Sequence, residues 1–84
     1  MPPLRLRLQL FSVLRERLGR EVLDVEVPAG SAGGDLLDIL ARTYPDIAAY
    51  RSTIRLAINE AYERETYRLS PGDDVALITP VSGG

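Results

Sequence analysis

Residues 4–11 read Leu4-Arg5-Leu6-Arg7-Leu8-Gln9-Leu10-Phe11, an alternation of apolar and polar side chains. Because successive side chains of a β-strand point to opposite faces, this alternation predicts a strand with one buried face. We expect its four leucines to lie in the core and its arginines to face solvent. Such a strand needs a layer of other elements on its apolar face.

A short helix should follow at once, because Leu14 and Leu18 are four positions apart and Gly19 is placed to end a helix in a left-handed cap. Residues 22–27 then alternate again and predict a second strand, which Pro28 ends. We expect the two strands to be antiparallel neighbours.

The main helix is predicted over residues 35–44, after a glycine-rich loop at 29–34, and Pro45 should close it. Its apolar positions fall on one helical face. They are Leu36, Leu37, Leu40, Ala41 and Tyr44.

The C-terminal half alternates strands and turns. Residues 54–59 predict a third strand, a turn at 59–61 leads into a short strand near Tyr62, and Pro71 and Gly72 mark a further turn. The continuous apolar run at 75–78 is typical of a central strand buried on both faces.

This order of elements predicts an α+β roll, a mixed sheet of about four to five strands packed on one main helix. We expect one domain over residues 1–79 and a flexible tail over residues 80–84, with no internal repeat.

The composition excludes several classes of protein. The chain has 84 residues, a formal charge of −2, and neither Cys nor His; its basic residues are all arginine. Disulfides, thiolate nucleophiles, imidazole bases and the usual zinc ligands are therefore absent from the sequence. The balanced charge argues against nucleic acid as a partner, and the lack of a long apolar run argues against the membrane, so we expect a cytoplasmic protein.

The chain ends in Pro80-Val81-Ser82-Gly83-Gly84. Five extended residues reach about 17 Å, enough to enter the active site of another protein, and glycine allows close approach of that protein's backbone. The carboxylate of Gly84 is the best candidate for the working chemical group. Once joined to AMP it would accept sulfide and become a thiocarboxylate, so a protein without Cys could carry sulfur.

Four stretches resemble the small subunit of molybdopterin synthase, and the resemblance covers essentially the whole chain. They are residues 11–19, 57–59, 71–78 and 80–84. The resemblance implies the ubiquitin-like β-grasp fold and a sulfur carrier that is not catalytic alone.

The resemblance also implies the partners. An E1-like adenylyltransferase would activate Gly84 with ATP, a sulfurtransferase would supply sulfur, and the large synthase subunit would form a heterotetramer with this chain. Sulfur would pass there to cyclic pyranopterin monophosphate, and this chain itself would bind no cofactor and no metal.

The family's apolar docking surface maps onto Phe11, Tyr62 and Ile78. The alternative is that these are core or half-buried sheet residues. For Ile78 the docking and core interpretations are equally favoured. For Tyr62 docking is favoured, because its hydroxyl suits an interface that is partly exposed to water. Val81 is a further candidate anchor, and Asn59 is expected to hold a turn.

The sequence departs from the family pattern at two places. Ala32-Gly33 stands where a Thr-Val-like pair is usual, which removes a capping hydroxyl and leaves Ser31 or Asp35 to cap the main helix. Thr79-Pro80 stands where paired prolines are common. Neither departure touches the terminal glycines.

Three other functions stay open at this point. The sulfur could serve thiamin synthesis or tRNA thiolation, Gly84 could be joined to lysines of other proteins as in a ubiquitin-like modifier, or the chain could be an interaction module whose glycine end is incidental.

Overall fold

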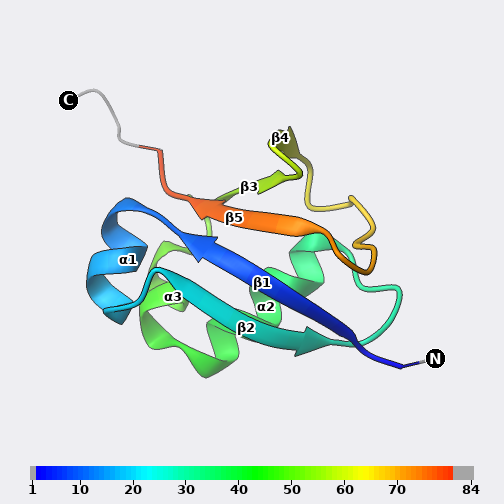
Figure 1. The fold of residues 1–84 in the computed structure, drawn as a ribbon. Helices are drawn as coiled ribbons and strands as arrows, with labels where there is room; N and C mark the ends of the chain where they lie inside the picture. The colour runs from blue at the N-terminus through cyan, green and yellow to red at the C-terminus, as the bar shows by residue number, and fades with distance from the viewer. Residues whose placement is uncertain (1, 81–84) are drawn as a thin grey trace.

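In the computed structural model of the protein, which describes residues 2–80, a five-stranded mixed sheet is covered on one face by helices (Figure 1). The strand order is β2-β1-β5-β3-β4, in which β1 and β5 are parallel and the other neighbours antiparallel. The elements are β1 Leu4–Leu10, α1 Ser12–Leu18, β2 Val22–Val27, α2 Gly33–Thr43, α3 Pro45–Tyr50, β3 Arg55–Ile58, β4 Ala61–Glu63 and β5 Asp74–Ile78.

The leucines of β1 form the middle of the core, as their alternation predicts. Leu8 is fully buried, and the arginines between the leucines are exposed. The expected antiparallel pairing with β2 is present and sets Leu8 opposite Leu23. The helix over Ser12–Leu18 and its left-handed cap at Gly19, with φ 67°, also agree with the sequence.

The central place of β5 is confirmed, but its burial on both faces is not. Val75 and Leu77 are fully buried, whereas Ala76 and Ile78 between them are only half-buried. The helices lie on one side of the sheet, so alternate residues of β5 face the uncovered side. We call that side the open face.

Helix α2 begins at Gly33, two residues before the predicted start, because the chain after β4 supplies its cap. The amides of Gly33 and Gly34 donate to the carbonyl oxygens of Tyr67 and Glu65, at 2.9 and 2.8 Å. A side chain at Gly33 would collide with Leu56. Glycines thus allow this loop to lie directly against the helix start.

The capping carboxylate is that of Asp35, one of the two alternatives. The amide of Ala32 donates to Asp35 Oδ2 at 2.9 Å. The hydroxyl of Ser31 instead donates to the carbonyl of Pro28 at 2.7 Å, within the preceding turn. Ser31 therefore stabilises the loop and does not cap the helix.

A third helix, α3, was not predicted. Pro45 ends the α2 pattern but also starts α3, because proline fits the first turn of a helix, where its missing amide is not needed. The side chain of Ile47 is fully buried. The main helix of the predicted roll is α2, and α3 is a shorter helix that follows it directly.

Arg51, just after α3, joins three segments of the chain. Its guanidinium donates to both carboxylate oxygens of Glu65, at 3.0 and 2.8 Å, and to Asp38 on α2 at 3.1 Å. The hydrogen bond from Arg51 lowers the pKa of the Glu65 carboxyl, and the same bond raises the pKa of Arg51 above its already high value. This cluster holds the capping loop against α2.

We expect Glu65→Gln to lower the free energy of unfolding by about 1 kcal/mol at neutral pH, discounted for partial exposure of the pair. The pKa of Glu65 is lower in the folded state than in the unfolded state. The ionised carboxylate therefore contributes fully to the free energy of unfolding above the unfolded-state pKa of about 4.3, and this contribution is lost as the pH falls through the folded-state pKa. Urea unfolding at about pH 7 and about pH 3 should show a smaller difference from wild type at the lower pH. Glu26→Gln, in the exposed pair with Arg5, is the control and should change less; an equal difference at both pH values would contradict the assignment.

The hairpin between β3 and β4 is closed by Asn59 and Glu60, both with positive φ, at 53° and 70°. Asn59 holds this turn, as expected: its side chain donates to Asp73 Oδ1 and accepts from the amide of Asp74, both at 3.0 Å. Two-residue turns of this kind favour glycine at the second position, where Glu60 stands.

Glu60→Gly should therefore raise the free energy of unfolding by about 0.5 kcal/mol, because relief from the left-handed conformation slightly exceeds the entropy that glycine loses. Thermal or urea unfolding of the variant and of wild type measures this difference in the free energy of unfolding. Glu16→Gly in the exposed face of α1 is the matched control, and it should destabilise the protein. A loss of stability in Glu60→Gly would show that the turn carries no such strain.

Candidate docking face and tail exit

The chain leaves the sheet from the end of its central strand. Thr79 is buried after β5, and Pro80, the last described residue, is exposed. Because β1 and β5 are parallel, the exit lies at the end of the sheet where β1 turns into α1 (Figure 1). The remaining predicted tail residues, Val81, Ser82, Gly83 and Gly84, lie outside the described residues.

The register places one row of residues across the open face. Gln9 of β1 is opposite Val22 on one side and Ala76 on the other, Ala76 is opposite Ala57, and Ala57 is opposite Tyr62. The middle of the row is thus made of small alanines, with larger side chains toward both edges. A partner's apolar side chain could approach the sheet closely there.

Of the three expected docking residues, Phe11 and Ile78 lie at this end of the sheet. Phe11 is 39% exposed and Tyr62 is 67% exposed, which is unlike a core residue, and Ile78 is half-buried on the open face. Since Leu10 pairs with Leu77, the next residues, Phe11 and Ile78, lie at the same level of the sheet. Tyr62 stands apart from them, on edge strand β4. Their role in binding stays a prediction.

The sequence reasoning missed Val22. It is 38% exposed on the open face beside Gln9, and with Phe11 and Tyr62 it completes the exposed large hydrophobic residues of the described chain. The alternation of β2 could have predicted this exposure, because Val22 lies on the same face of the strand as the polar residues Asp24 and Glu26.

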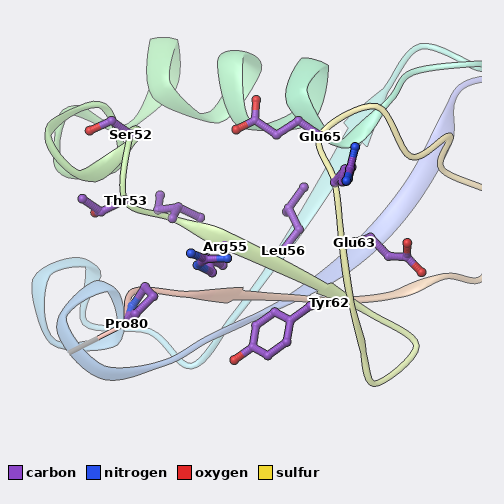
Figure 2. A pocket seen from close by; sticks show the side chains of 10 residues that line it. Ser52, Thr53, Arg55, Leu56, Tyr62, Glu63, Glu65 and Pro80 are labelled. Carbon is purple, nitrogen blue, oxygen red and sulfur yellow. The ribbon is translucent and has the colours of Figure 1, made fainter. Parts of the chain in front are cut away.

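Pro80 also borders two hollows. One, of about 650 Å³, is lined by Arg55, Tyr62 and Arg64 and by Ser52 and Thr53 (Figure 2). The other, of about 660 Å³, lies on the side of α1 and α3. The sequence reasoning had not singled out Arg55 or Arg64.

Over residues 2–80, no group of three or more metal-ligating side chains is found, and no helix in that range is long and apolar enough to cross a membrane.

Comparison with known proteins gives the family. The model of the ThiS family matches residues 8–84. The chain belongs to this family. Three curated relatives in the comparison carry the name molybdopterin synthase sulfur carrier subunit. They come from Arabidopsis thaliana, at 34% identity over 94% of this chain and 82% of the relative; Aedes aegypti, at 33% over 95% and 89%; and Mycobacterium tuberculosis, at 34% over 73% and 74%.

Solved structures agree on the fold. SAMP1 from Haloferax volcanii is 28% identical, with a TM-score of 0.79 over 95% of this chain and 99% of that one. A putative molybdopterin converting factor, subunit 1, from Pyrococcus furiosus has a TM-score of 0.82 over 93% and 99%, at 20% identity. The β-grasp fold and the resemblance to the small subunit of molybdopterin synthase are thereby confirmed.

Stability measurements separate docking residues from core residues. We expect Tyr62→Ala to change the free energy of unfolding by less than about 1 kcal/mol, because an exposed side chain loses little on truncation. Leu77→Ala, on the buried face of β5, should cost about 2–5 kcal/mol. Urea unfolding of both variants provides the comparison. Similar losses would assign Tyr62 to the core.

Proposed function

We propose that the protein is the sulfur carrier of molybdenum cofactor synthesis and that the C-terminal carboxylate of Gly84 is the group that carries the sulfur. The observation that carries this proposal is the match over most of the chain to relatives named molybdopterin synthase sulfur carrier subunit, together with the ThiS family match, which extends to Gly84. The exit of the chain beside an exposed apolar face supports it.

The chemistry takes place on the tail. A carboxylate is a poor electrophile, so an E1-like adenylyltransferase first joins Gly84 to AMP from ATP, with release of pyrophosphate. Sulfide sulfur delivered by a sulfurtransferase then attacks the carbonyl carbon, and AMP leaves. The product is a thiocarboxylate, and the glycines leave its carbonyl open to both reactions.

The recipient in this proposal is cyclic pyranopterin monophosphate, held by the large synthase subunit in a heterotetramer. The apolar row on the open face, together with Phe11 and Ile78, would dock on that subunit. Residues 80–84 would extend into its active site, since they reach about 17 Å. ATP is consumed by the activating partner, and the carrier binds no cofactor.

Deletion of Gly84 should abolish sulfur loading and transfer while leaving the melting temperature nearly unchanged, because the glycine lies beyond the last strand. Intact mass spectrometry after incubation with the activating enzyme, ATP and sulfide checks loading. Wild type should gain the mass of sulfur in place of oxygen. Addition of one residue after Gly84 is the matched variant, and loading of either variant would refute the mechanism.

A second candidate function is protein modification, which the likeness to the small archaeal modifier protein 1 of Haloferax volcanii favours. The two chemistries share the adenylate and differ in the nucleophile, sulfide or a lysine amine. In the mass experiment, adducts of higher mass in place of the thiocarboxylate would support modification. The names of the curated relatives favour molybdopterin over thiamin or tRNA as the recipient of the sulfur.

A further inference from the structure

Two arginines lie unpaired in the groove at the root of the tail. Arg55 and Arg64 both line the groove that Pro80 and Tyr62 border. The ion pairs of residues 2–80 involve Arg5, Arg7 and Arg51 but neither of these two. Both side chains belong to exposed residues. Their positive charges therefore face solvent without a partner in the described chain.

The acidic residues of the same groove do not neutralise them. Glu65 is held by two hydrogen bonds from Arg51. Glu63 forms no ion pair with another residue of the range 2–80, and in Figure 2 its carboxylate points away from Arg55. The groove thus has a local positive charge, although the whole chain carries −2.

The register makes this arrangement unfavourable for the free chain. Leu56 is the partner of Glu63, and Arg55 and Arg64 are the next residues on the two segments, so their positive charges lie on neighbouring parts of the chain. Like charges on neighbouring strands repel each other. Binding of an anion between them would remove that repulsion.

We propose that this groove binds carboxylate side chains of the protein that receives the tail, the large synthase subunit in the function proposed above, on which this inference rests. The groove shares Tyr62 with the docking face, so a partner on that face would reach it. The terminus of a tail about 17 Å long reacts at a distance from its root, which favours a partner's acidic side chains over a nucleotide phosphate at the reacting end.

Charges at the edge of an interface act mainly on the association rate and on its salt dependence. The test is a titration of the large subunit encoded by the same genome against wild type and Arg55→Glu/Arg64→Glu, at about 50 mM and about 500 mM salt. Arg42→Glu, on α2 away from the open face, is the matched control. Thermal melting checks that each variant folds. If the charge-reversal variant Arg55→Glu/Arg64→Glu does not fold, the neutral variant Arg55→Gln/Arg64→Gln replaces it.

We expect wild-type binding to weaken with salt and the double reversal to raise Kd by about 10-fold at low salt with little further salt dependence. Arg42→Glu should bind the large subunit and transfer sulfur like wild type. Equal affinities of wild type and double reversal would overturn the groove assignment and leave the carrier function intact. Wild type that loads sulfur but does not bind the large subunit would overturn both proposals. Binding of ATP that the double reversal abolishes would assign the groove to a nucleotide instead.

Discussion

Burial of one face of the sheet against the helices is the constraint on which the rest of the structure depends. In a chain of 84 residues there is room for a single core, and the leucines of β1, the buried residues of β5 and the apolar face of α2 fill it. Once this face is covered, every second residue of each strand must face outward. The open face, with its alanines and exposed aromatic side chain, is the direct result of that alternation.

Much of the fold could be predicted because its signals are local. The alternation of β1, the cap at Gly19 and the apolar run of β5 each depend on neighbouring residues. The start of α2 and the whole of α3 were missed, because the first depends on carbonyl groups of Tyr67 and Glu65, far along the chain, and Pro45 was interpreted only as an end. Arg51 pairs with residues from two other segments, and no spacing in the sequence indicates that.

The residues of the candidate site also fall into those that the sequence could predict and those that required the structure. Phe11, Tyr62 and Ile78 could be named from a family resemblance, and their exposure agrees with a docking role. Val22, Arg55 and Arg64 required the register, since only the pairing of strands shows that residues distant in sequence share the open face or the groove. In the proposed function, the folded part of the protein provides recognition, while the chemistry is confined to residues beyond the last strand.

The parallel pairing of β1 with β5 joins the first strand of the chain to the last. Pairing residues so far apart in sequence closes a long loop, which costs more entropy than a local contact. Until β5 is inserted, the β1–β2 and β3–β4 pairs have no strand to join them into one sheet. On a ribosome, the segment that completes the sheet is followed directly by the tail. A partner that recognises the closed sheet would thus receive only tails from chains that have finished folding.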